Sequence, residues 1–233
     1  MRSLARFVLG KAKPATGPDA PSTVPVKMVL FDFDGTLADT FADGLEILND
    51  LSKQFGFRRL EGEDIERARD MTTRQVMKFL GVPSRKLPTI AQHGVTKLKE
   101  RMPAVRPFPG IAEMVQDLTS MGVRVGIVTS NSEENVNYFL RNHQIDGIEF
   151  VRSSSRLLGK ARVIRRAMKE FNFRPEDSLF VGDETRDIEA CRRADLRCIA
   201  VTWGYNSERA LSAQAPYRII HSPTELKGSV INY

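Results

Sequence analysis

The stretch VLFDFDGTLADT, residues 29–40, ends an apolar run with two aspartates one residue apart. The run VKMVLFDF (26–33) hardly alternates between apolar and polar residues, which predicts a strand buried on both faces. Side chains two apart on a strand share a face, so Asp32 and Asp34 can point the same way, and Gly35 gives the backbone freedom to turn. Carboxylates about 4 Å apart repel by about 4 kcal/mol at an effective dielectric constant of 20, so either a cation or a bound proton is expected. Oxygen ligands of this kind suit Mg²⁺.

Aspartates after strands also cap or turn the chain, and for an isolated pair this is the commoner role. The rest of the pattern therefore has to decide. Buried runs like the first return at 123–130, 177–183 and 197–204, with a weaker one at 148–153, and helical patterns lie between them at 111–122, 133–143, 160–171 and 184–195. This alternation predicts an α/β fold, a Rossmann-like and mostly parallel sheet flanked by helices. In such sheets ligands bind beyond the carboxyl ends of the strands.

Residues 42–105 break the alternation, because helical patterns follow one another there without a buried-strand run. We expect an inserted helical lobe of this extent, too small to hold an independent sheet. The α/β core then comprises residues 26–41 and 106–233. Residues 1–25 form a basic, Pro-rich extension.

The net charge of +6 does not by itself indicate nucleic-acid binding. Residues 1–26 carry four basic residues and one acidic residue, so half of the excess lies in the extension. The dense basic stretch at 152–169 reads as a solvated helix face, and neither interleaved aromatic residues nor a known reading motif accompanies it. We therefore expect no nucleic-acid partner; salt-dependent retention on DNA or RNA would contradict this.

Membrane insertion and disulfide bonding are not expected either. No apolar run approaches the roughly 20 residues needed to cross a bilayer. Cys191 and Cys198 are the only cysteines, and they have no metal-ligand spacing with the three histidines. They are expected to be reduced packing residues of a cytoplasmic protein.

Polar residues end several of the predicted strands, and they form an ordered set of motifs. DFDGT (32–36), VTSN (128–131), Lys160 at the start of a helical pattern, and GDETRD (182–187) follow one another along the chain. Together they resemble the four motifs of the haloacid dehalogenase superfamily. The resemblance covers roughly residues 27–226, and Ala161 departs from it, because many relatives have proline after the lysine.

The resemblance implies that Asp32 is a nucleophile that takes a phosphoryl group as an aspartyl phosphate. Asp34 is then the general acid that protonates the leaving oxygen and the base that activates water. This division suits a nucleophile that stays ionised and a neighbour that carries a proton. Thr129 corresponds to the hydroxyl residue that holds phosphoryl oxygens, helped by the backbone amides of Ser130 and Asn131. Taken alone, Thr129 reads as an ordinary strand-end residue.

The remaining motifs imply the charge balance of the site. Lys160, next to the amide donors of a helix start, spreads negative charge in the transition state. Asp183 completes a Mg²⁺ shell with Asp32 and the backbone oxygen of Asp34, while Asp187 acts through water or orients Lys160. Taken separately, Lys160 reads as a surface lysine and Asp187 as an exposed first-turn aspartate.

Within the superfamily, Asp34 argues against dehalogenases and phosphonate-cleaving enzymes, which lack an aspartate at this position. Phosphatase and phosphomutase remain, since both keep all four motifs. A helical cap between the first two motifs resembles phosphoglycolate phosphatase-like and beta-phosphoglucomutase-like enzymes, whose caps close over small soluble substrates. In the cap, Arg74 is expected to bind a carboxylate or second phosphate of the substrate. An exposed helix arginine is an equally open interpretation.

The sequence thus predicts a Mg²⁺-dependent phosphatase for a small phosphorylated metabolite, with phosphoglycolate-type substrates first. The alternative is a sugar phosphomutase that needs a bisphosphate activator and releases little phosphate. A non-catalytic interaction protein on this fold would have lost motif residues, and none is lost.

Overall fold

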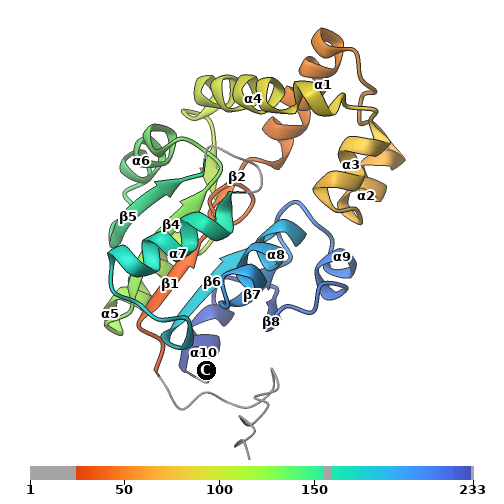
Figure 1. Ribbon diagram of the computed structural model, residues 1–233. Helices are drawn as coiled ribbons and strands as arrows, with labels where there is room; N and C mark the ends of the chain where they lie inside the picture. Colours follow the sequence, from red (N-terminus) through yellow and green to blue (C-terminus); the bar gives the residue numbers. More distant parts are fainter. Residues whose placement is uncertain (1–24, 155–158, 232–233) are drawn as a thin grey trace, which may run out of the picture.

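The computed structural model describes residues 25–154 and 159–231, so residues 1–24 of the predicted extension lie outside the described part (Figure 1). Its main sheet has six strands, all paired in parallel. In spatial order these are β5 (Ile148–Ser153), β4 (Arg124–Thr129), β1 (Met28–Phe31), β6 (Ser178–Gly182), β7 (Arg197–Val201) and β8 (Arg218–Ile220). The predicted Rossmann-like α/β fold is confirmed.

Helices cover both faces of this sheet (Figure 1). One face packs against α5 (Ile111–Ser120), α6 (Glu133–Asn142) and α10 (Glu225–Ile231). The other packs against α7 (Lys160–Glu170), α8 (Thr185–Arg193) and α9 (Glu208–Ser212). The central strand serves both cores, because Val29 and Phe31 join the first cluster while Met28 and Leu30 join the second. This explains why its sequence lacks alternation.

Four helices form a separate bundle, which we call the helical lobe (residues 41–101). They are α1 (Phe41–Phe55), α2 (Glu63–Arg69), α3 (Thr73–Phe79) and α4 (Leu87–Arg101), with a 3₁₀ turn at Ser84–Lys86. The lobe has its own buried apolar cluster, built from Ile47, Leu51, Leu60, Ala68, Leu80, Val82 and Ile90. Two short strands, β2 (Ala38–Asp39) and β3 (Arg106–Pro107), pair antiparallel where the chain enters and leaves it.

Other expectations can be compared with the described residues. Arg162, Arg165, Arg166 and Lys169 of α7 are exposed, as predicted for a solvated basic face. Cys191 and Cys198 are free and buried, as predicted. None of the helices within the described residues is both long and apolar enough to cross a membrane. The sequence did not predict β8, α9 or α10, which have only three, five and seven residues.

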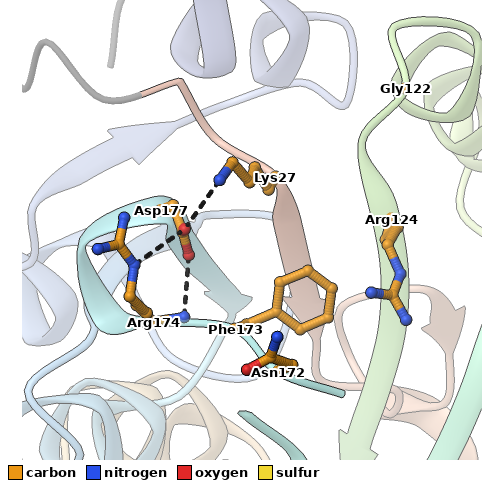
Figure 2. Close-up of a pocket in the computed structure, with 7 residues that line it drawn as sticks. All are labelled: Lys27, Gly122, Arg124, Asn172, Phe173, Arg174 and Asp177. Carbon is orange, nitrogen blue, oxygen red and sulfur yellow. Dashed lines mark hydrogen bonds and ion pairs between the residues drawn. The ribbon is translucent and has the colours of Figure 1, made fainter.

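A pocket of about 430 Å³ lies where β1, β4 and β6 begin, at the edge of the sheet opposite their carboxyl ends (Figure 2). Its charged groups are already paired. Lys27 and Arg174 lie 3.6 and 3.5 Å from the Asp177 carboxylate, and Arg124 forms an ion pair with Glu149. With its cations neutralised in this way, the pocket offers no strong anion site.

Candidate active site

The first aspartate of DFDGT lies directly beyond the carboxyl end of β1, at the centre of the sheet. Asp32 is only 1% exposed. Its Oδ1 accepts a hydrogen bond from the Phe33 amide at 2.8 Å, and its Oδ2 lies 2.5 Å from the Lys160 ammonium. The backbone amide of Asp32 donates to the Val181 carbonyl of β6 at 2.9 Å. The carboxylate is therefore held in one position, directly beside a cation.

The second aspartate lies past the strand, in the turn that Gly35 makes with a φ of 76°. The carboxylate oxygens of Asp34 accept hydrogen bonds from Asn131 Nδ2 at 3.2 and 3.1 Å. Burial, and next the negative charge of Asp32, raise the pKa of Asp34 to about 7. A carboxyl that keeps its proton near neutral pH can act as a general acid.

Lys160 is the first residue of α7, and it is buried between two carboxylates. Its Nζ lies 2.5 Å from Asp32 and 2.6 Å from Asp187. Burial lowers the pKa of the ammonium, but the attraction of Asp187 and Asp32 outweighs burial and leaves the pKa above its ordinary value. The interpretation as a surface lysine is therefore wrong, and Lys160 carries a permanent positive charge into the site.

The GDETRD segment brings two further buried aspartates to the same edge of the sheet. Asp183 accepts hydrogen bonds from Thr36 Oγ1 at 2.6 Å and from the Tyr205 amide at 2.8 Å. Asp187 accepts from the Glu184 amide at 3.1 Å as well as from Lys160. Burial raises the pKa of Asp183 and raises that of Asp187 to about 6. Asp187 is fully buried, so it is not an exposed first-turn residue.

Carboxylate oxygens gather closely enough here to hold a cation. Oxygens of Asp32, Glu184 and Asp187 lie within 4.8 Å of one another. Burial first, and then the charges of Glu184, Asp187 and Asp32, raise the pKa of Asp183. Buried carboxylates that repel one another fit a hard divalent cation such as Mg²⁺. This set overlaps the expected ligands Asp32, Asp34 and Asp183 only in part.

Two glycines fix the position of Asp183. A Cβ atom at Gly35 or at Gly204 would clash with the Asp183 carboxylate, and one at Gly204 would also clash with the Gly35 carbonyl. The turn after β1 and the loop after β7 can therefore approach Asp183 only without side chains at these positions.

The last residue of β4 and the residues just after it reach the site differently from the expectation. Thr129 is buried, and its hydroxyl accepts a hydrogen bond from the Asn131 amide at 3.0 Å. That amide is therefore already engaged, and Asn131 reaches Asp34 through its side chain instead. Asn131 Oδ1 accepts from the Ser132 amide and from Asn135 Nδ2, both at 2.8 Å, which orients its amide group. Ser130, between Thr129 and Asn131, is half-buried.

Arg74 does not belong to this cluster. It lies in the first turn of α3 in the helical lobe, and its side chain is exposed. The turn just before α3 contacts the core, because the Arg69 carbonyl accepts a hydrogen bond from the Ser207 amide at 2.9 Å. Arg74 is thus an exposed residue of the lobe, outside the carboxylate cluster.

Three residues of the site were missed although all of them lie inside the quoted motifs. Thr36 of DFDGT binds Asp183, and Glu184 of GDETRD joins the carboxylate cluster and pairs with Arg186. Arg186 is close enough to lower the pKa of Asp34, although less than burial and Asp32 raise it. The motif spacing held the signal, since GDETRD places Glu184 and Arg186 on either side of the helix start.

Comparison with known proteins decides the family. Residues 29–201 match the family model described as haloacid dehalogenase-like hydrolase. The chain is a haloacid dehalogenase-like hydrolase. The resemblance that the four motifs suggested is confirmed.

Relatives of this haloacid dehalogenase-like hydrolase include phosphoglycolate phosphatases. It is 30% identical over 206 residues to phosphoglycolate phosphatase of Synechococcus elongatus, a match that covers 88% of this chain and 97% of that protein. It is 29% identical over 198 residues to phosphoglycolate phosphatase of Nitrosospira multiformis, covering 80% and 87% of the two chains.

Solved structures of the same fold lie further away in sequence. The crystal structure of a predicted phosphatase from Clostridium acetobutylicum superposes with a TM-score of 0.77 at 21% identity, covering 91% of this chain and 100% of that one. CbbY from Rhodobacter sphaeroides, solved in complex with phosphate, gives a TM-score of 0.67 at 21% identity, covering 86% and 96%. At these identities the likeness supports the fold alone.

Proposed function

We propose that the chain is a Mg²⁺-dependent phosphatase that hydrolyses a small phosphomonoester through an aspartyl phosphate on Asp32. The observation that carries the proposal is the contrast between two neighbouring carboxyls. Asp32 lies 2.5 Å from the Lys160 ammonium, while burial and the charge of Asp32 raise the pKa of Asp34 to about 7. Asp32 is thus placed as a nucleophile beside a cation, and Asp34 keeps a proton near neutral pH.

The chemistry follows from these two states. An Asp32 carboxylate oxygen attacks phosphorus, the bond from phosphorus to the leaving oxygen breaks, and Asp34 donates its proton to that oxygen. Asp34, now ionised, takes a proton from water as the water attacks phosphorus; the bond to Asp32 breaks and inorganic phosphate leaves. Lys160 offsets negative charge at Asp32 throughout. Mg²⁺, held by Asp32 and its neighbouring carboxylates, would neutralise phosphoryl oxygens.

Phosphoglycolate is our leading substrate, because curated relatives at 29 and 30% identity carry the name phosphoglycolate phosphatase. We further propose that the helical lobe acts as a cap over a small, soluble metabolite in the cytoplasm, with neither nucleic acid nor membrane as a partner. A screen of phosphorylated metabolites with Mg²⁺ tests this. Phosphate release, highest from phosphoglycolate, supports the proposal; conversion of a glucose phosphate without release would instead indicate the mutase.

Arg74→Ala should raise KM for phosphoglycolate by about tenfold and change KM for 4-nitrophenyl phosphate by less than about twofold. The reason is that a guanidinium binds the second acidic group of the first substrate, and the aryl ester has no such group. Steady-state kinetics on both substrates measure the difference. Arg85→Ala, at the 3₁₀ turn of the same lobe, is the matched control. Equal KM changes for both substrates would make Arg74 a plain surface residue.

The buried carboxyls should make the stability of the protein depend on pH, and Mg²⁺ should change that dependence. Folding raises the pKa of Asp34 from an ordinary 3.8 to about 7 and that of Asp187 from 3.8 to about 6. Between pH 3.8 and pH 7 the folded protein therefore binds more protons than the unfolded chain. Without metal, stability therefore falls as pH rises from 5 to 7.5. In EDTA we expect the Tm to fall over this range, less so in Asp34→Asn. Mg²⁺ should raise the Tm more at pH 7.5 than at pH 5, because protons compete with the ion.

A further inference from the structure

The loop that follows β7 touches both the Asp183 segment and the helical lobe. Asn206, in this loop, is 6% exposed, and its backbone amide and both polar atoms of its side chain form hydrogen bonds. Its amide donates to the Asp183 carbonyl at 3.3 Å, and its Oδ1 accepts from the Thr185 amide at 2.9 Å. Its Nδ2 donates to the Arg69 and Met71 carbonyls at 2.8 and 2.9 Å.

The hydrogen bonds of Asn206 connect two parts of the molecule, the core and the helical lobe. The acceptor and the backbone amide of Asn206 bind the core, and both side-chain protons bind the turn between α2 and α3. A buried amide satisfied on every atom is positioned strictly, because each unpaired polar group would cost free energy. Asn206 therefore ties the segment that carries Asp183 to the lobe.

Neighbouring residues strengthen the same contact. The Ser207 hydroxyl lies 2.5 Å from the Asp70 carboxylate, which also pairs with Arg209. The Tyr205 hydroxyl donates to the Thr40 carbonyl at 3.0 Å, and the Tyr205 ring packs edge-on against Phe41 at 5.3 Å. The loop thus holds the lobe both at its entry and at the α2–α3 turn.

The α2–α3 turn leads directly into α3. Thr72 caps this helix, because its hydroxyl accepts from the Gln75 amide and the Gln75 side chain accepts from the Thr72 amide. The cap transmits the position of the turn to the first turn of α3, where Arg74 lies.

We propose that Asn206 is a positioning residue, which holds the α2–α3 turn, and Arg74 with it, against the core segment that bears Asp183. Opening of the lobe breaks the two hydrogen bonds from Nδ2, so Asn206 sets how often the lobe is closed. Turnover of a small substrate that the closed lobe must enclose depends on this contact; hydrolysis of an aryl ester depends on it less.

The first test needs no substrate and so does not rest on the proposed function. Hydrogen exchange of the full chain with Mg²⁺ should be at least about fivefold faster at residues 69–76 in Asn206→Ala, because the turn loses two partners. Asp70→Ala, on the lobe side and away from Asp183, should show the same local change to a smaller degree. Unchanged exchange at 69–76 in either variant overturns the proposal.

The second test is kinetic and rests on the proposed phosphatase activity. Asn206→Ala should lower kcat/KM for phosphoglycolate by about tenfold and for 4-nitrophenyl phosphate by less than about threefold. The Mg²⁺ concentration for half-maximal hydrolysis of the aryl ester should stay within about twofold. Equal losses on both esters together with a shifted Mg²⁺ requirement would make Asn206 a structural support of Asp183 alone.

Asn49→Ala is the matched control. Asn49 also makes paired side-chain hydrogen bonds to backbone, with the Leu60 carbonyl at 3.0 Å and the Leu60 amide at 2.8 Å, but both lie within the lobe. Asn49→Ala should lower the Tm and change kcat/KM for phosphoglycolate and for 4-nitrophenyl phosphate by the same factor. A chain without phosphatase activity would void the kinetic test and leave the exchange result standing. If Asn49→Ala lowers kcat/KM for phosphoglycolate more than for the aryl ester, as Asn206→Ala does, the effect comes from destabilisation of the lobe in general and the proposal fails.

Discussion

Asp32→Asn should lower phosphate release by at least about 10⁴-fold and leave the chain folded. An amide oxygen is a poor nucleophile, so the covalent step has no attacking group. The fold should survive because Lys160 keeps its partner Asp187 at 2.6 Å. Phosphate release at saturating Mg²⁺ measures the first effect and thermal unfolding the second. Acid-quenched labelling from a phosphorylated substrate should trap phosphoryl protein in the wild type and none in the variant.

Asp39→Asn makes the same substitution at an exposed position in the same segment and should change activity by less than about twofold. Asp34→Asn is the complementary case, since it removes the proton donor and leaves the nucleophile. It should accumulate label on Asp32 from an aryl ester with a good leaving group, because hydrolysis lacks its base. Mg²⁺-dependent turnover retained by Asp32→Asn would remove the proposed nucleophile.

Lys160→Met should have the second-largest effect, on both stability and turnover. Removing the ammonium leaves Asp32 and Asp187 buried without their cation, and breaking a buried pair in this way costs about 3 kcal/mol in the free energy of unfolding. The loss should be larger at pH 8 than at pH 5, because Asp187, whose pKa burial raises to about 6, is protonated at pH 5 and no longer repels Asp32. Urea unfolding at the two pH values, in EDTA, measures it.

Turnover by Lys160→Met should fall by at least about 100-fold, because no cation beside Asp32 then offsets the negative charge of the transferring phosphoryl group. Lys169→Met supplies the control on the same helix, where an exposed lysine should change stability by less than about 0.5 kcal/mol. Equal stability losses in the two variants would mean that the buried ion pairs contribute nothing specific.

The sequence predicted the parts of the fold whose signal is local. The central strand is buried on both faces and therefore reads as an unbroken apolar run, and each long helix has a regular apolar spacing. β8 was not predicted, because three residues are too few to show a periodicity and the strand is defined only by its pairing with β7. The aspartate pair was placed on a strand, whereas β1 ends at Phe31 and the turn at Gly35 carries Asp34.

The sequence likewise predicted some contacts of the candidate site and missed others. Lys160 contacts both Asp32 and Asp187, an arrangement that the family resemblance implied and that strand spacing alone did not predict, because Lys160 and Asp187 lie on helices. The partners of Asp183 were not predicted, because Thr36 and Tyr205 reach it from segments 147 and 22 residues away. Such contacts depend on how loops close in three dimensions, which a linear pattern does not encode.

The short pair of β2 and β3 has a practical consequence. Ala38 pairs with Pro107 and Asp39 with Arg106, so the chain leaves the core and returns to it at neighbouring points. Everything between these points can in principle be exchanged as one cassette, since any insert with adjacent ends fits the same two-stranded stem. Chimaeras that graft a foreign bundle onto this stem would keep the reacting groups and change what they act on, a modular route to altered selectivity.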